Sequence, residues 1–396
     1  MRNFLLASLM ALAICTCSGG GGNSGNGVPV AQSPTPTPTP TPTTPPPPLA
    51  NLPSWVNALA IGQWAQVSNT ALSSVEPSPV PDGNTGPQSK VVAWTSFVVD
   101  TRTSKVYSVA GGGHTDYAGN EVDELTLETD TPAWTQRLAP TPGAQLTNCQ
   151  SYYGDDRPAA RHSYYGVTLD TTNDRIMLFG GAEWCVNGGF HSAISSYNIG
   201  ANQYSPSSTH GSVGNFGNGV SAYAVDPLTG NVYAAKDFAF GLWNRSTNTF
   251  STLRPTGSPA AGNESMSAMD TTRGRILFAG GQTPGGDHHT YTISSNTFTA
   301  ISLNGANAAN VAAADGAAMV YVDVMDRYLV RLGGVGGTVY QINPTTFEVT
   351  TYPTTGGASV PATQNGPYNK FLYVPRLGGV IYAPTYSGNV WFMRIR

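Results

Sequence analysis

One short segment gathers side chains that could move protons. In residues 109–121, VAGGGHTDYAGNE, three glycines are followed by His114, Asp116, Tyr117, Asn120 and Glu121. Histidine exchanges a proton most readily near neutral pH, and a carboxylate such as Asp116 or Glu121 can orient it. Tyr117 could donate a proton or stack on a sugar ring. The same residues also fit a turn whose Asp and Asn side chains bond to backbone amides, and the sequence leaves both interpretations open.

A second candidate is the pair Arg161 and His162, in the segment PAARHSYYG. A cation beside an imidazole could neutralise an acidic group of a ligand, such as a uronate, and leave the histidine as a base. The alternative is that both side chains bond between neighbouring structural units and have no role in chemistry. The catalytic hypothesis therefore rests on His114, Tyr117, Arg161 and His162 together.

Composition limits the partners that these residues could serve. The chain has 396 residues, a net charge of −4 and only 11% charged residues. The chain has 19 Lys and Arg residues against 23 Asp and Glu residues, too few cations to neutralise a phosphate backbone, so nucleic acid is not expected as a partner. With 46 glycines and 30 prolines, and no long apolar pattern at helical spacing, the chain is expected to form strands joined by turns.

The first 50 residues differ from the rest and are expected to lie outside the fold. Residues 1–17 resemble a bacterial secretory leader, with Cys17 or Cys15 as the candidate lipid-attachment residue of a lipoprotein. Neither cysteine has a small residue before it, so ordinary secretion is the alternative. Residues 18–50 form a linker, Gly/Ser-rich and then Pro/Thr-rich. Its stretch PTPTPTPTPTTPPPP favours a stiff spacer of roughly 45 Å.

The remaining chain, residues 51–396, contains a repeat. Six first strands end at Asp100, Asp170, Asp226, Asp270, Asp323 and Pro375. Six residues after each of these positions an aliphatic residue opens a second strand, across a short polar or glycine-bearing turn typical of a hairpin. Large residues then recur seven apart in five units: Leu127 and Trp134, Tyr197 and Tyr204, Trp243 and Phe250, Tyr291 and Phe298, Tyr340 and Phe347.

The sixth unit is incomplete at its C-terminal end. Trp391 has no partner seven residues later because the chain ends at Arg396, whereas Trp64, in IGQWAQV, resembles Trp134, in TPAWTQR. The N-terminal strand is therefore expected to complete the last unit. This predicts an all-β, six-bladed β-propeller closed by joining its two ends. A β-sandwich is the alternative, and it would not explain the displaced strand.

The glycine doublet followed by paired aromatic residues resembles the Kelch repeat. That resemblance implies a Kelch-like propeller of the galactose-oxidase central-domain type. Copper-radical oxidation of the galactose-oxidase kind is disfavoured, because arginine rather than tyrosine precedes His162. Propeller polysaccharide lyases are the nearer analogy, at the level of the fold alone.

In such a propeller, the loops after second and fourth strands share one face, here called the long-loop face. All six histidines are expected there, with neighbouring polar residues as ligand contacts; these contacts are Asp116, Asn120, Glu121, Glu183, His191, His210, Asp287 and His288. A metal ion could bind His288 or His289 with Asp287, or Cys185 with His191, but no cofactor is predicted. Cys149 and Cys185 belong to this face of blade 2 and are expected to form a disulfide, as an exported protein allows.

These observations predict an exported protein of the bacterial cell envelope, anchored by a lipid or secreted, and monomeric. Its long-loop face is expected to bind an extracellular ligand, most plainly a polysaccharide. One alternative is a carbohydrate-active enzyme, such as a polysaccharide lyase that uses His114 and Tyr117 with Arg161. Another is a scaffold that binds a surface protein.

Overall fold

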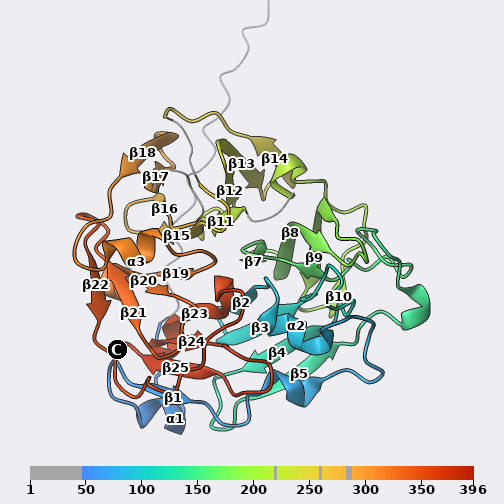
Figure 1. The fold of residues 1–396 in the computed structure, drawn as a ribbon, viewed down its shortest axis with the longest axis horizontal. Helices are drawn as coiled ribbons and strands as arrows, with labels where there is room; N and C mark the ends of the chain where they lie inside the picture. The colour runs from blue at the N-terminus through green and yellow to red at the C-terminus, as the bar shows by residue number, and fades with distance from the viewer. Residues whose placement is uncertain (1–46, 218–220, 258–260, 282–287) are drawn as a thin grey trace, which may run out of the picture. The chain divides into compact units, whose positions relative to one another are not determined.

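A computed structural model describes residues 47–217, 221–257, 261–281 and 288–396. Cys15, Cys17 and Asp287 therefore lie outside the described residues, together with the leader and nearly all of the linker. Six antiparallel sheets are arranged as a six-bladed β-propeller, which confirms the predicted fold (Figure 1). Five sheets have four strands, and the sheet of blade 2 has five.

Consecutive strands pair antiparallel within the blades, except that β6 of blade 2 pairs with β8 and β25 of blade 6 pairs with β1. The strands of blades 1 to 3 are β2 (Phe97–Asp100), β3 (Lys105–Val109), β4 (Val122–Thr126) and β5 (Ala133–Leu138); β6 (Arg161–His162), β7 (Val167–Asp170), β8 (Arg175–Glu183), β9 (Phe190–Asn198) and β10 (Gln203–Tyr204); and β11 (Ala222–Val225), β12 (Val232–Lys236), β13 (Ala239–Asn244) and β14 (Thr249–Thr252).

Blades 4 to 6 repeat this arrangement. Their strands are β15 (Met266–Asp270), β16 (Arg275–Ala279), β17 (His288–Thr292) and β18 (Thr297–Ile301); β19 (Ala318–Val322), β20 (Arg327–Arg331), β21 (Val339–Ile342) and β22 (Val349–Tyr352); and β23 (Phe371–Val374), β24 (Gly379–Tyr382), β25 (Trp391–Arg394) and β1 (Trp64–Gln66). Among the described residues, three short α-helices lie outside the blades: α1 (Ser54–Asn57), α2 (Ser89–Val92) and α3 (Ala308–Ala312).

The ring closes as the displaced sixth unit predicts. Strand β1 pairs antiparallel with β25, and Gln66 lies opposite Trp391 while Trp64 lies opposite Met393. The Trp64 indole is buried, and its Nε1 donates a hydrogen bond to the Gly337 carbonyl at 2.9 Å. The first residues of the folded chain therefore hold its last strand in place.

In three blades, the two large residues that lie seven apart in the sequence face each other across adjacent strands. Tyr197 lies opposite Tyr204, Trp243 opposite Phe250 and Tyr291 opposite Phe298. In blade 1, Trp134 lies opposite Leu125 rather than Leu127. In blade 5, Phe347 falls in the turn at a positive φ of 56°, and Tyr340 lies opposite Thr351. The turn geometry of these two blades shifts the register, which the letter spacing alone does not reveal.

Candidate functional site

The glycines of residues 111–113 let the β3–β4 loop of blade 1 run against blade 2. Gly112 N donates to the Arg161 carbonyl at 3.1 Å, and Arg161 N donates to the Ala110 carbonyl at 2.9 Å. A Cβ on Gly113 would lie 2.2 Å from the Ala182 carbonyl oxygen, at a φ of +82° that side chains rarely adopt. The close approach of two backbones therefore explains the glycine run.

This backbone contact brings two histidines from neighbouring blades together. The rings of His114 and His162 stack with centroids 5.3 Å apart and planes inclined by 15°. Nε2 of His162 lies 2.9 Å from Oδ2 of Asp116, whose other oxygen accepts a 2.6 Å hydrogen bond from the Thr85 hydroxyl. Gly188 covers the His114 ring, where a Cβ would come within 2.9 Å of Cε1. Both imidazoles are thus held in place.

The protonation of this pair follows from burial and charge. Burial lowers the pKa of His162, although the hydrogen bond to Asp116 and its charge act in the opposite direction. The hydrogen bond from His162 in turn lowers the pKa of Asp116. A neutral His162 that donates its Nε2–H to the Asp116 carboxylate satisfies both shifts. Nδ1 of His162 then carries the lone pair.

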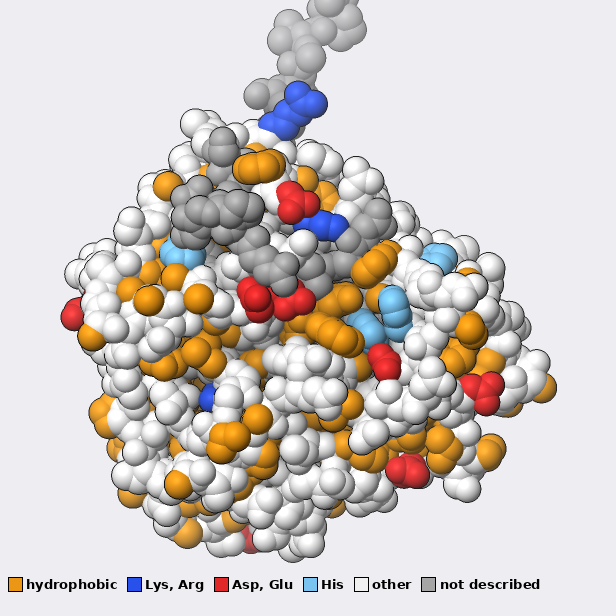
Figure 2. Space-filling view, viewed as in Figure 1, with side chains coloured by type: hydrophobic (Ala, Val, Ile, Leu, Met, Phe, Trp, Pro, Cys, Tyr) orange, Lys and Arg blue, Asp and Glu red, His pale blue; other side chains and the backbone are white. Residues whose placement is uncertain are grey.

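Aromatic side chains extend the stacked pair in both directions. Trp94 lies 5.1 Å from the His162 ring, and Phe190 lies 6.2 Å from the His114 ring. We call Trp94, His162, His114 and Phe190 the aromatic row. Phe190 is 47% exposed at one end, and Trp94 is half-buried at the other. On this face, histidine and carboxylate side chains lie beside apolar ones (Figure 2).

Other residues of the 111–121 segment lie beneath this surface. Tyr117 is fully buried, and its hydroxyl donates to Glu121 at 2.9 Å. Glu121 forms an ion pair with buried Lys90, which also pairs with Asp123. Burial raises the pKa of Tyr117, and the charges of Glu121 and Asp123 raise it further. The described position of Tyr117 gives it neither contact with a surface ligand nor an easily released proton.

Asn120 likewise has internal partners, because its amide donates to the Thr141 hydroxyl and to the Pro158 carbonyl. These contacts join the 111–121 loop to the long segment before blade 2. Asp116 and His114 are therefore the polar side chains of this loop that reach the aromatic row.

Arg161 and His162 are adjacent in β6, yet their side chains have separate surroundings. Arg161 is fully buried, donates to the Gly180 carbonyl at 3.2 Å and lies 3.6 Å from Oε1 of Glu183. Neighbouring residues of a strand point to opposite sides, so His162 joins the aromatic row while Arg161 faces Glu183. In this position Arg161 cannot neutralise a ligand on the surface.

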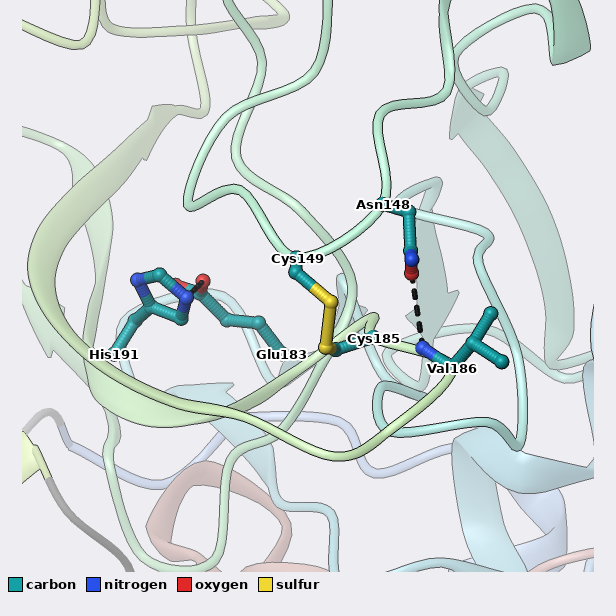
Figure 3. The surroundings of a disulfide bond; sticks show 6 residues. All are labelled: Asn148, Cys149, Glu183, Cys185, Val186 and His191. Atoms are coloured by element: carbon teal, nitrogen blue, oxygen red, sulfur yellow. Dashed lines mark hydrogen bonds and ion pairs between the residues drawn. A yellow bond between two sulfur atoms is a disulfide. The ribbon is translucent and has the colours of Figure 1, made fainter.

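The predicted disulfide is confirmed between Cys149 and Cys185 (Figure 3). It ties the segment before blade 2 to the end of β8, and the Asn148 side chain reinforces it by accepting a hydrogen bond from Val186 N at 2.9 Å. Beside it, Nε2 of His191 lies 3.3 Å from Oε2 of Glu183. These two predicted ligand contacts are therefore neighbours.

The remaining histidines do not join the aromatic row in the described structure. His210 bonds to Ser196 in β9 and to Asn248 in the β13–β14 turn. These bonds join the connection that follows β10 to blade 3. His288 and His289 are buried at the start of β17. Within the described residues, no group of three or more His, Cys, Asp or Glu side chains could hold a metal ion.

A cavity of about 260 Å³ lies near the propeller axis, beside the turns that join first and second strands. It is lined mainly by the first strands of blades 1, 2, 3 and 6, including Val98, Leu169, Tyr223 and Val225. None of its lining residues carries a carboxylate, amine, guanidinium or imidazole. The lining of this cavity therefore offers no acid or base for catalysis.

Sequence reasoning missed Trp94, Phe190, Tyr164 and Thr85 as parts of this site. Tyr164 lies edge-on to the His162 ring at 6.2 Å. The available signal was a tryptophan, Trp94, three residues before the first strand of blade 1, because first strands line the central axis of a propeller. Phe190 carried no such signal, since its exposure depends on the path of the disulfide-linked loop.

No protein-family model matches the chain, and the search of curated proteins finds no match to it. The part of the chain that the structure describes contains no helix that is long and apolar enough to cross a membrane.

Proposed function

We propose that the long-loop face binds a glycan without carboxylate groups through the aromatic row. The main observation that supports this proposal is a continuous series of ring contacts, from Trp94 through His162 and His114 to Phe190, beside the carboxylate of Asp116. Trp94 and Phe190, at the two more exposed ends of the row, offer ring surface that can pack against the apolar face of a sugar, whereas His162 is buried and its ring faces His114. The carboxylate of Asp116 can accept hydrogen bonds from sugar hydroxyls.

Charge favours a neutral ligand over a polyuronate. Arg161, which precedes His162 in β6, and Lys90 are both buried and paired with carboxylates. Asp116, in contrast, is partly exposed and would repel a uronate. A lyase needs a group that neutralises the carboxylate of its substrate, so this geometry supports binding better than uronate elimination.

Proton transfer is the second candidate function, favoured by the His162–Asp116 pair with a second imidazole stacked on it. A neutral His162 could take up a proton at Nδ1, and His114 could supply one. In this version of the lyase hypothesis, Tyr117 and Arg161 support the loops from below.

The finer parts of the proposal concern family and location. The glycine doublets and the aromatic pairs of blades 2 to 4 support a Kelch-like relationship. The leader-like residues 1–17 support export with lipid attachment at Cys17 or Cys15, and the Cys149–Cys185 disulfide fits an oxidising compartment. The ligand would then be an extracellular polysaccharide; a surface protein is the alternative.

The test is affinity electrophoresis of the full chain against neutral glycans and polyuronates. We expect retardation by at least one neutral glycan and a loss of affinity of about tenfold or more in Trp94→Ala, because a stacking contact contributes on the order of 1–1.5 kcal/mol beyond its buried area. Phe238→Ala is the matched control, because Phe238 is 80% exposed in the β12–β13 loop of the same face but outside the row.

Preferential binding of polyuronates, or equal effects of the two variants, would contradict the proposal. Formation of an unsaturated product from a polyuronate, abolished in His162→Ala, would instead establish the second candidate.

A further inference from the structure

A second cluster lies beside the disulfide and takes no part in the aromatic row. Ser151 Oγ lies 2.7 Å from Nδ1 of His191, and Nε2 of the same ring lies 3.3 Å from Oε2 of Glu183. Figure 3 shows His191 and Glu183 directed toward one another next to the Cys149–Cys185 bond. The hydroxyl and the carboxylate thus lie at opposite nitrogens of one imidazole, and the hydroxyl also lies close to the carboxylate.

The surroundings of Glu183 suit the orienting member of such a series. Its side chain is fully buried, and among the described residues its oxygens have no hydrogen-bond partner that satisfies strict geometry. Arg161, at 3.6 Å, supplies a compensating charge on the side away from His191. Burial raises the pKa of the Glu183 carboxyl to about 7, so the group is ionised above neutral pH, and in that form it attracts the positive charge that the His191 ring acquires on protonation.

The other two members are accessible. The His191 side chain is 32% exposed, and Ser151 is half-buried. Burial lowers the pKa of His191, so the ring is neutral near pH 7 and its Nδ1 can accept the serine proton. Ser151 is held from both sides, since its carbonyl accepts a hydrogen bond from Ala159 N at 3.0 Å and Cys149 anchors the chain two residues earlier.

We propose that Ser151, His191 and Glu183 form a hydrolytic centre for small acyl esters, with Ser151 as nucleophile, His191 as general base and Glu183 as the positioning carboxylate. This centre is separate from the aromatic row and does not rest on the proposed glycan binding. The two nitrogens of imidazole can exchange the roles of acceptor and donor, so contact of serine with Nδ1 rather than Nε2 preserves the chemistry.

The reaction balances with water as the only co-reactant. Oγ of Ser151 attacks the ester carbonyl carbon while its proton passes to Nδ1 of His191. The bond to the alcohol then breaks, and the alcohol leaves with that proton. Water attacks the acyl-serine, transfers a proton to His191 and releases the carboxylic acid as the proton returns to Ser151 Oγ. Glu183 stabilises the imidazolium in both halves.

The first test uses the unmodified protein and a fluorophosphonate probe, which reacts preferentially with activated serines. We expect stoichiometric labelling, mapped by peptide mass spectrometry to Ser151, together with hydrolysis of p-nitrophenyl acetate. Labelling at Ser151 should decline as the pH falls and His191 becomes protonated. Absence of label at Ser151 would overturn the proposal without any variant.

Variants then separate chemistry from structure. Ser151→Ala and His191→Gln should each lower ester hydrolysis by on the order of 10²-fold or more. Ser212→Ala is the matched control: Ser212 is an exposed serine bonded to Ser192, and its loss should leave the rate unchanged. Glu183→Gln should lower the rate and shift its pH profile. Hydrolysis that persists in Ser151→Ala would show that the cluster is structural.

Discussion

His114 and His162 come from different blades, yet their rings stack with centroids 5.3 Å apart. The contact depends on backbone bonding between the β3–β4 loop and β6, because Gly112 and Arg161 exchange hydrogen bonds with the facing chain. The site is therefore built at a junction of two blades, and anything that separates the blades should separate the imidazoles.

The pKa of His162 should lie below 6.5, because burial disfavours the imidazolium. Asp116→Asn should lower it further, since the carboxylate favours the charged ring. Because the native pKa lies below the unfolded value, the native state binds fewer protons, and stability falls as the pH drops from about 6.5 toward the native pKa. NMR titration of the imidazole resonances measures the pKa of His162 in the native protein and in Asp116→Asn, and urea unfolding at several pH values measures the change in stability. The resonance of His210, bonded to Ser196 and Asn248, serves as internal control and should not respond to Asp116→Asn.

Gly113→Ala should destabilise the protein by about 2–4 kcal/mol, because the new methyl would meet the Ala182 carbonyl at 2.2 Å with the backbone at φ +82°. Gly143→Ala is the control. Gly143 is exposed, and an added Cβ there has no atom within 4 Å, so the change should be within about 0.5 kcal/mol. Urea unfolding measures both. Equal stabilities of the two variants would show that the loop can move away from blade 2.

Trp64→Ala tests the ring closure and should cost about 3–5 kcal/mol. The indole is 2% exposed and bonds to the Gly337 carbonyl, so its loss leaves a cavity between blades 5 and 6. Ile61→Ala, at a side chain that is 65% exposed in the same N-terminal segment, should be nearly neutral. Thermal unfolding distinguishes them. A neutral Trp64→Ala would mean that strand β1 contributes little to closing the propeller.

Lys370 should make stability increase with pH above neutrality. Its side chain is buried, and its ammonium donates to the Thr95 carbonyl at 2.6 Å but forms no ion pair within the described residues. Burial lowers its pKa to about 7. Because the unfolded pKa is about 10.4, the native state binds fewer protons, and stability rises between about pH 7 and pH 10 by up to about 1.4 kcal/mol per pH unit.

Lys370→Met should remove this slope between about pH 7 and pH 9, which urea unfolding at several pH values can measure. Lys105→Met is the control, because Lys105 is partly exposed and paired with Glu124. An unchanged pH slope in Lys370→Met would place the lysine in a more hydrated position than the structure gives it.

The sequence by itself determined the number of blades and the closure of the ring. Both follow from local spacing. Each unit repeats the same alternation of strand and turn, and the segment around Trp64 resembles the fourth strand that the last unit, with Trp391, lacks. The disulfide was predictable for the same reason, since two cysteines of one blade face have few other partners. The strand register within blades 1 and 5 was not predictable, because the geometry of a turn can shift the pairing of two strands while the number of residues between them stays the same.

Only the tertiary structure decided which polar side chains form a site. Arg161 and His162 are neighbours in sequence, but one faces Glu183 and the other faces Trp94 and His114. Tyr117 appeared to be a surface residue and proved to be buried against Glu121. Burial and direction depend on how two blades pack against each other, which is a long-range property. The residue pattern of a single loop contains no information about the neighbour that covers it.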